Sequence, residues 1–366
     1  MAARDILYIP YMNSNAFPLL LHLAPGDPEP LREQIARQLR GRIARGELPE
    51  GELLPGHRQL ARQYRIAPST VEAAYDLLVA DGLLTGASAS DVRVAELRPE
   101  RRRVLVERLQ LEKLVAQELG RRELEMARDV QRRLLPPSEV AGPGWEVAAR
   151  CLPARVVAGD FYDILRHPDG SVDVVVADVA GKGFAASLIM ASVKAMLPFV
   201  TAEGGVAESL VYLNRRLAVE LGRGEFVALT LARYRPSERR VELANAGAPD
   251  PYLVRPGQPP KPLSVPGPRL PLGVREEVAY ASRTTEVSAD DRLLLLTDGL
   301  PEARDADGEP LGYEALESML GQKLSTGSPS SWLSELFDRV QRRTVRAPED
   351  DWTAAILMPR EAEVAP

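Results

Sequence analysis

Near the N-terminus, apolar residues recur at helical spacing and predict three short helices separated by turn residues. The apolar face of the first helix consists of Leu31, Ile35 and Leu39. The third helix is expected after the Ser69-Thr70 pair, because these residues are typical N-caps. Two short extended pieces, LLTG and DVRVAE, then close a unit that is mostly helical.

The next segment, residues 98–135, contains almost no glycine and is dense in Arg, Glu and Leu. Its apolar residues return at steps of three, four or seven: Leu105, Leu109, Ala116, Leu119, Met126, Val130 and Leu134. This spacing predicts one long helix, which ends at Pro136 and Pro137. Glu112 and Glu123 interrupt the apolar seam, so the helix either forms a weak, switchable pair with a second copy or packs on its own domain.

Beyond residue 142 the pattern changes to short β-rich runs with turn residues between them. The clearest runs are DVVVADV, FVALTLARY, RRVELANAG and RLLLLTDG. Two helical stretches, AASLIMASVKAMLPFV and ESLVYLNRRLAVEL, lie between these runs. The fold class predicted for this part is α+β, with two sheets and flanking helices.

Composition narrows the choice of function. A chain of 366 residues favours two domains, and a net charge of −6 argues against a broad nucleic-acid-binding field. One cysteine, Cys151, and three histidines leave too few ligands for a zinc site, so a buried apolar role is expected for Cys151. No apolar stretch approaches the roughly 20 residues of a membrane span, and no signal-peptide pattern is present. The expected location is the cytoplasm.

Four acidic positions share one pattern, in which an extended run ends and an Asp follows beside glycine or a second Asp. They are AGDFYD with Asp160 and Asp163, VVVADVAGKG with Asp178, LLLLTDG with Asp298, and PEDDWT with Asp350 and Asp351. Taken singly, each Asp-Gly is typical of a turn. Several carboxylates clustered at strand ends would repel one another, so together they indicate hard divalent cations, Mn²⁺ or Mg²⁺.

These blocks, in order, resemble the metal-dependent protein phosphatase (PPM) family. The strings that carry the resemblance are LPARVVAGDFYD, VADVAGKGFAASLIMA, ANAG, LLTDGLPEARD and EDDWTAAIL, spread over about 225 residues. The branch resembled is that of bacterial sporulation and stress-response (SpoIIE/RsbU-like) phosphatases, which act on anti-anti-sigma proteins of STAS type. The preceding ELEMARDVQRRLLP is similar to the helical linker of that branch, which is thought to be a regulatory switch.

The resemblance implies an α-β-β-α sandwich and a site with two metal ions. Carried over by motif, Asp160, Asp178, Asp298 and Asp350 would be ligands, with Asp178 bridging the ions and the Val179 carbonyl adding an oxygen. Asp351 and Asp163 would be second-choice ligands or outer-shell residues. Water activated by the ions would attack the phosphoryl group directly, without a covalent phosphoenzyme.

Some residues depart from the family pattern or stay ambiguous. Ala158 replaces the first of two glycines, and Ala248 stands where the family usually has histidine. Lys182 either faces phosphate or caps a turn. Cys151 lacks the CxxxxxR loop of cysteine phosphatases, so it is not expected to be a nucleophile.

Residues 28–95 resemble the winged helix-turn-helix of GntR-type transcription regulators. By position, Arg58, Ser69 and Thr70 would face DNA. Pro68 stands where that family commonly has arginine, and Asp91 adds negative charge to the wing, which opposes a phosphate contact. The module therefore either binds DNA or serves dimerisation and signal sensing.

The expected organisation is an N-terminal extension (1–27), a winged helix (28–96), a helical linker (97–137) and a phosphatase domain (138–366). The leading hypothesis is a homodimeric, Mn²⁺- or Mg²⁺-dependent serine/threonine phosphoprotein phosphatase under the control of its N-terminal module. The alternative is a GntR-like transcription regulator whose phosphatase-like domain only senses a metal or a phosphoprotein.

Overall fold

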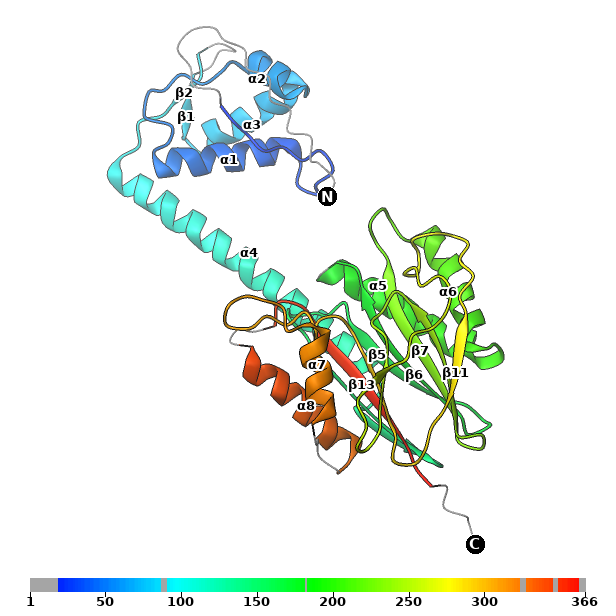
Figure 1. The fold of residues 1–366 in the computed structure, drawn as a ribbon. Coiled ribbons are helices and arrows are strands. Elements are labelled where there is room, and N and C mark those ends of the chain that lie inside the picture. The colour runs from blue at the N-terminus through cyan, green and yellow to red at the C-terminus, as the bar shows by residue number, and fades with distance from the viewer. Residues whose placement is uncertain (1–18, 87–90, 182, 323–326, 345–347, 362–366) are drawn as a thin grey trace. The chain divides into compact units, whose positions relative to one another are not determined.

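The computed structural model describes residues 19–86, 91–181, 183–322, 327–344 and 348–361 (Figure 1). The chain forms two compact units, residues 1–120 and 121–366. Each unit has its own hydrophobic core, as expected for a chain of this length.

The first unit contains the three predicted helices and a small hairpin. Its elements are α1 (Leu31–Arg45), α2 (His57–Tyr64), α3 (Pro68–Ala80), β1 (Leu84–Thr85) and β2 (Arg93–Val94). The hairpin is antiparallel, and Leu53 bridges to Arg93 beside it. The expected N-cap at Ser69-Thr70 is wrong: Ala67 is the N-cap of α3 and Pro68 is its first residue, where the missing N–H of proline costs nothing.

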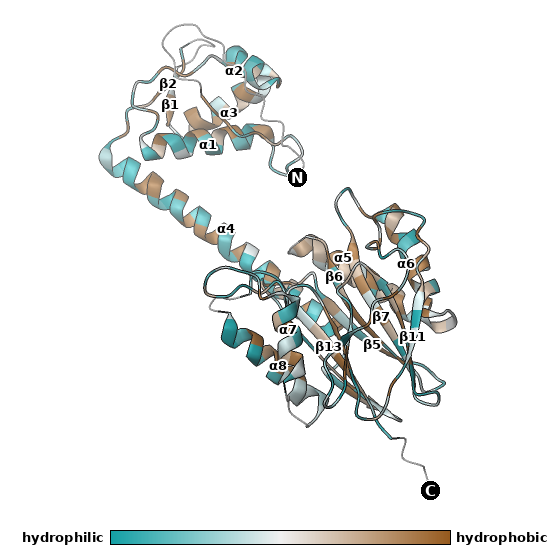
Figure 2. Ribbon diagram, viewed as in Figure 1, coloured by the Kyte–Doolittle hydropathy of each residue, from teal (hydrophilic) through white to brown (hydrophobic). Residues whose placement is uncertain are grey.

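A single helix, α4 (Pro99–Leu134), follows β2, and the boundary between the two units lies within it. Hydrophilic and hydrophobic residues alternate along α4 (Figure 2). Exposed apolar side chains are frequent on it, including Leu111, Leu119 and Met126, which are 62%, 56% and 62% exposed. The predicted long helix is present, but burial within this chain does not account for its apolar residues.

Two antiparallel sheets form the second unit. The six-stranded sheet has the order β10-β9-β12-β13-β4-β3, and the five-stranded sheet has the order β11-β8-β7-β6-β5. The strands of the first are β3 (Glu139–Gly142), β4 (Trp145–Leu152), β9 (Tyr252–Val254), β10 (Lys261–Pro262), β12 (Arg292–Leu296) and β13 (Trp352–Pro359). Those of the second are β5 (Phe161–Arg166), β6 (Val172–Val179), β7 (Val227–Arg235), β8 (Arg240–Ala246) and β11 (Ser282–Glu286).

Helices cover the outer face of each sheet, giving the α-β-β-α sandwich that the sequence predicts (Figure 1). The helices are α5 (Phe184–Glu203) and α6 (Val206–Glu220) on the five-stranded sheet, and α7 (Gly312–Gly321) and α8 (Pro329–Arg343) on the six-stranded sheet. The central strands are apolar on both faces because each lies between the inter-sheet core and a helix layer.

Helix α5 corrects one expectation from the sequence. Among the described residues it is the one helix long and apolar enough, over residues 184–202, to cross a membrane by length and composition. In this fold Met190, Val193 and Leu197 pack on the five-stranded sheet. Lys194 lies 2.6 Å from the carboxylate of Asp163 in β5. One face of the helix therefore packs on the sheet, while Leu188 and Phe199 are 55% and 81% exposed.

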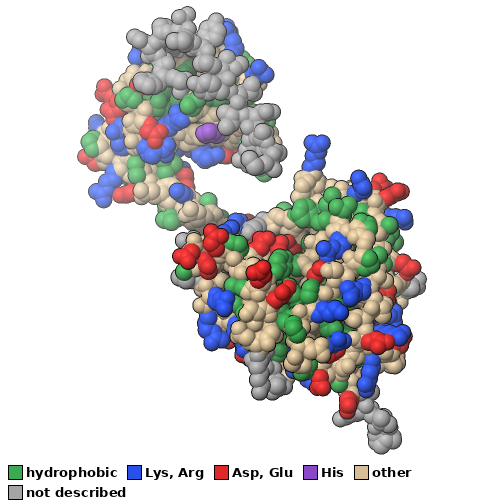
Figure 3. Space-filling view, in the orientation of Figure 1, with side chains coloured by type: hydrophobic (Ala, Val, Ile, Leu, Met, Phe, Trp, Pro, Cys, Tyr) green, Lys and Arg blue, Asp and Glu red, His purple; other side chains and the backbone are tan. Residues whose placement is uncertain are grey.

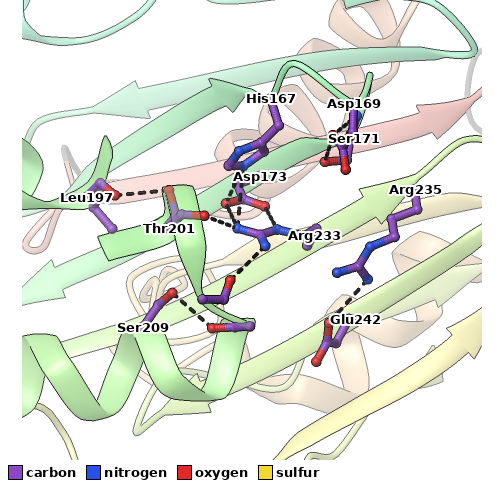
Figure 4. Close-up of polar contacts among 12 residues, drawn as sticks. His167, Asp169, Ser171, Asp173, Leu197, Thr201, Ser209, Arg233, Arg235 and Glu242 are labelled. Carbon is purple, nitrogen blue, oxygen red and sulfur yellow. Dashed lines mark hydrogen bonds and ion pairs between the residues drawn. The ribbon is translucent and has the colours of Figure 1, made fainter. Parts of the chain in front are cut away.

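A buried ion pair attaches the C-terminal end of α5 to the sheet (Figure 4). The guanidinium of Arg233 in β7 donates to both carboxylate oxygens of Asp173 in β6, at 2.7 and 2.8 Å. It also donates to the carbonyls of Thr201 and Gly204. His167 lies 2.8 Å from the same carboxylate. Because helix ends leave carbonyls without partners, Arg233 both pairs a buried charge and caps α5.

Candidate active site

The alternation of strand β6 decides where its acidic residue points. Val172, Val174 and Val176 lie in the inter-sheet core, whereas Val175 and Ala177 face the helices. Side chains two residues apart lie on the same face of a strand. The side chain of Asp178, at the end of β6, therefore points toward the space between the two sheets.

Strand β5 brings a second carboxylate to this place. Tyr162 and Ile164 face the inter-sheet core, and Asp160, immediately before the strand, has the same parity. Phe161 is paired with Ala177, which sets Asp160 beside Asp178 at one end of the five-stranded sheet. Asp160 is only 3% exposed.

The opposite sheet contributes residues at the same end. Leu296 of β12 pairs with Ala354 of β13, so the C-terminal end of β12 meets the N-terminal end of β13. Thr297 and Asp298 follow β12. Thr297 donates from its hydroxyl to the Asp160 carboxylate at 2.7 Å, and this bond joins the two sheets across the site.

The carboxylates repel one another strongly. Burial first, and repulsion from Asp178 second, raise the pKa of Asp160 well above its usual range, although the hydrogen bond from Thr297 opposes the shift. Burial, followed by repulsion from Asp298, raises the pKa of Asp178 to about 6, and Asp350 and Asp351 add to the repulsion. Five aspartates predicted from the sequence thus influence one another at a single edge of the sandwich.

The chemistry of this group fits hard cations. Its donors are oxygens, and a positive charge would remove the repulsion that raises these pKa values. The hydroxyl of Thr353 is buried next to the group and, like that of Thr297, lowers the pKa of Asp160. Among the described residues, however, no three His, Cys, Asp or Glu side chains have the spacing of a closed ligand set. Burial and mutual repulsion, which both raise the pKa values of Asp160 and Asp178, are the features of this group that a bound cation would offset.

Gly159 lies close to the carbonyl of Val179, the predicted backbone ligand, which belongs to a buried residue. A Cβ atom at position 159 would lie 2.9 Å from the Val179 oxygen. That distance is too short for a carbon that does not bond to the oxygen, so a side chain at position 159 would force the two segments apart. The glycine before Asp160 is therefore required by the approach of the two loops and not merely by a turn.

Asp351 occupies a different position from the other carboxylates. One of its oxygens accepts from Ala154 N at 2.7 Å, and the other accepts from Gly159 N at 2.8 Å and from Asp160 N at 3.4 Å. Asp350 lies beside it and accepts from Asp351 N at 3.0 Å. Asp351 thus supports the loop that carries Asp160.

The second-choice ligand Asp163 is not part of this group. It shares the parity of Phe161, which packs among the residues facing the helices. Its carboxylate pairs with Lys194 of α5, and both side chains are at most 10% exposed. Asp163 therefore connects β5 to α5, on the face of the sheet opposite to Asp160.

The predicted DNA-facing residues lie in the first unit. Arg58 is exposed on α2, and Ser69 and Thr70 lie in the first turn of α3, exposed and half-buried respectively. Asp91 pairs with Arg93 at 2.9 Å in the wing region. Lys182 lies outside the described residues.

Two contacts of the site were missed by the sequence reasoning. Gln131 in α4 donates to the Ala158 carbonyl and accepts from the Ala158 amide. Thr353 pairs with Thr297 through its backbone. It lies two residues after Asp351, on the same face of the strand, and this alternation in EDDWT could have indicated its position from the sequence. For Gln131 no such signal exists, because its neighbours in the helix are polar or exposed.

Family models match two parts of the chain. The model described as "Stage II sporulation protein E (SpoIIE)" matches residues 168–359, and the model described as "Bacterial regulatory proteins, gntR family" matches residues 31–94. Phosphoserine phosphatase RsbU of Bacillus subtilis (strain 168) is 25% identical over 238 residues, which cover 64% of this chain and 69% of RsbU. The transcriptional regulator PdxR of Corynebacterium glutamicum is 34% identical over 76 residues, which cover 21% of this chain and 17% of PdxR.

Solved structures show the same architecture. The SiaA-PP2C domain of Pseudomonas aeruginosa has a TM-score of 0.56 and 20% identity, covering 67% of this chain and 99% of that one. The RsbU and RsbW domains of Rv1364c from Mycobacterium tuberculosis have a TM-score of 0.53 and 24% identity, covering 63% of each chain. The present chain thus spans less than two thirds of the Rv1364c structure. At these identities the likeness establishes the PP2C fold.

Proposed function

The chain belongs to the Stage II sporulation protein E (SpoIIE) family and carries a GntR-type region before it, and we propose that it removes phosphate from serine or threonine of a regulatory protein. The resemblance to the metal-dependent protein phosphatases is confirmed, and with it the fold. One observation supports the activity most directly. Asp160 lies beside Asp178 at one end of the sandwich, and burial together with repulsion from Asp298 and Asp350 raises the pKa of Asp178, a cost that bound cations would offset.

The proposed substrate is a phosphorylated anti-anti-sigma protein of STAS type or a similar regulator. The relative RsbU is a phosphoserine phosphatase, and its similarity extends over most of both chains. On the face of the second unit shown in Figure 3, acidic, basic and hydrophobic side chains are interspersed. Such a mixed surface suits a folded protein partner better than a polyanion.

The proposed cofactors are two divalent cations, Mn²⁺ or Mg²⁺. Asp160, Asp178, Asp298 and Asp350 would hold them, with the Val179 carbonyl as a further ligand. When bound, such ions supply a water of lowered pKa and neutralise phosphoryl charge. Thr297 donates a hydrogen bond to the Asp160 carboxylate, and Asp351 accepts one from the amide of Gly159 in the loop before it.

Single substitutions test this function. Asp178→Asn and Asp298→Asn should each abolish Mn²⁺-dependent phosphate release from a phosphoserine protein, measured by phosphate production. Asp290→Asn is the matched control, because Asp290 is exposed and precedes the opposite end of β12. Full activity in either site variant would contradict the proposal. The partner can be sought with Asp298→Asn protein as bait, followed by dephosphorylation of the captured protein with the wild type.

DNA binding by the first unit is a second candidate function. The gntR family match over residues 31–94 favours it, and Arg58 and Ser69 are exposed where such contacts are made. A gel-shift series with promoter fragments at low and at moderate salt tests it. Sequence-specific binding that weakens with salt and with Arg58→Ala supports the proposal. Failure to bind any fragment at low salt counts against it.

We further propose that the chain is a cytoplasmic homodimer. The exposed apolar residues of α4 would be covered by the same helix of a second copy, because two helices with apolar seams bury those seams against each other in a coiled coil. Light scattering at micromolar concentration tests the dimer, and a monomeric mass would refute it. Fractionation of cells into soluble and membrane material tests the location.

A further inference from the structure

Gln131 occupies an unusual position in helix α4. The whole of α4 lies in the described part of the chain, and Gln131 is its one buried residue, at 7% exposure. The nearby apolar side chains of Met126, Val130 and Leu134 are 62%, 49% and 42% exposed. Burial of a polar side chain in preference to apolar ones indicates that hydrogen bonding, and not packing alone, determines the contact.

The hydrogen bonds of Gln131 satisfy both backbone polar groups of one residue, Ala158. Its Nε2 donates to the Ala158 carbonyl at 2.7 Å, and its Oε1 accepts from the Ala158 amide at 3.0 Å. Ala158 is only 2% exposed and lies in the irregular loop before β5, so no strand pairing provides partners for these two groups. A buried peptide group without a partner is costly. The conformation of this loop thus depends on Gln131.

The loop leads directly to the proposed metal site. Gly159 and Asp160 follow Ala158, and their amides donate to Asp351 at 2.8 and 3.4 Å. The Asp160 carboxylate accepts from Thr297. The segment is therefore held by α4 on one side and by the strands of the six-stranded sheet on the other. A change at Gln131 reaches the Asp160 carboxylate through two peptide bonds.

We propose that Gln131 is a positioning residue for the metal site, which ties the last turns of α4 to the loop that carries Asp160. The inference rests on the proposed metal-dependent function and names a residue on which the geometry of its site depends. One residue of helix corresponds to a rise of about 1.5 Å and a turn of about 100°. A displacement of that size breaks both hydrogen bonds, because N–H···O distances beyond about 3.5 Å no longer bond. Ala158 would then lose the partners of both its backbone groups, and the segment that carries Asp160 would lose its attachment to α4.

The end of α4 is fixed by two further contacts in the same unit. Leu135 packs partly into the inter-sheet core and partly into the core beneath α5 and α6. The hydroxyl of Tyr162 donates to the Pro136 carbonyl at 3.2 Å. These contacts hold the end of the helix near β5. Gln131 alone among the three meets the peptide next to the ligand-bearing residues.

The test uses Gln131→Met, which keeps the length of the side chain and removes both hydrogen bonds. The matched control is Gln117→Met, because Gln117 is exposed on the same helix. Mn²⁺ binding to the full-length, EDTA-stripped proteins is measured by calorimetry. The dissociation constant should rise about ten-fold or more in Gln131→Met, as for other residues that orient metal ligands, and should be unchanged in Gln117→Met. Wild-type affinity in Gln131→Met would overturn the inference.

Residue-resolved hydrogen exchange of the metal-free wild type provides an independent measurement, should the variant fold poorly. The Ala158 amide should exchange slowly, and rapid exchange there would overturn the inference whatever the variant does. Neither measurement requires a phosphorylated substrate. A chain that binds Mn²⁺ but releases no phosphate therefore refutes the proposed function and leaves the role of Gln131 standing. A wild type that binds no Mn²⁺ refutes both.

Discussion

Asp178→Asn should stabilise the metal-free protein while removing its activity. In the folded state the Asp178 carboxyl has a pKa of about 6, against its usual 3.8, because of burial and of repulsion from Asp298. Below pH 3.8 the carboxyl is protonated whether the chain is folded or not, so it has no effect on stability. Between pH 3.8 and about 6 the folded state retains a proton that the unfolded state has released. The free energy of unfolding therefore falls as the pH rises through this window.

Above pH 6 the free-energy cost of the ionised Asp178 no longer changes with pH, and the size of this cost follows from the rise in the pKa of Asp178. At about 1.4 kcal/mol per pKa unit, the ionised Asp178 destabilises the metal-free fold by about 3 kcal/mol. Asparagine keeps the shape and removes the charge. For a domain of this size the variant should melt roughly 5–10 °C higher than the wild type at pH 8. Asp160 and Asp178 titrate as a pair, so part of this gain in stability comes from the changed ionisation of Asp160.

The assay is thermal unfolding followed by circular dichroism in EDTA, at pH values from 4 to 8. The difference between Asp178→Asn and the wild type should be near zero at pH 4 and should grow to its full value by pH 7. Asp290→Asn, with its exposed side chain, is the control and should show no such difference. An unchanged or lower melting temperature for Asp178→Asn at pH 8 would refute the electrostatic account of the site.

Three further predictions follow from the contacts around the site and in the helix layer. Asp351→Ala should destabilise the metal-free protein by about 2–4 kcal/mol in the same melts, because the amides of Ala154 and Gly159 lose a charged acceptor. A stabilised variant would show that the repulsion between Asp351 and the other carboxylates outweighs these hydrogen bonds. Arg233→Met should cost about 3–5 kcal/mol in urea unfolding, since it leaves Asp173 buried without its partner; Arg223→Met, at an exposed position, is the control. Mn²⁺ at about 100 times its dissociation constant should stabilise the wild type by about 2.7 kcal/mol in calorimetric melts and should leave Asp178→Asn unchanged; equal stabilisation of both would place the ions elsewhere.

The sequence predicted the architecture well because its patterns are local. Alternation along a strand such as β6 is a property of neighbouring residues, and so is the helical spacing in α4. The family of the phosphatase domain was recognisable from the Asp-Gly motifs and their order. Asp160 and Asp178 could therefore be named before their surroundings were known, and the structure brings them together.

What the sequence could not supply is the partner of each polar group. The motif ranked Asp160 above Asp163 as a ligand but did not show that Asp163 pairs with Lys194, more than thirty positions further along the chain. The roles of Asp351 and Gln131 also depend on contacts between distant segments. At Ser69-Thr70 a strong local signal was outweighed by the preference of Pro68 for the first position of a helix.

The single cysteine has a practical consequence for spectroscopy. Burial raises the pKa of the Cys151 thiol, so little reactive thiolate forms near neutral pH, although part of the residue reaches the surface. A cysteine introduced at an exposed position of α4, such as Gln117, would then be the dominant site for a maleimide dye or a nitroxide label. Distances between two such labels in a pair of chains could be followed while Mn²⁺ is added, without first removing the native residue.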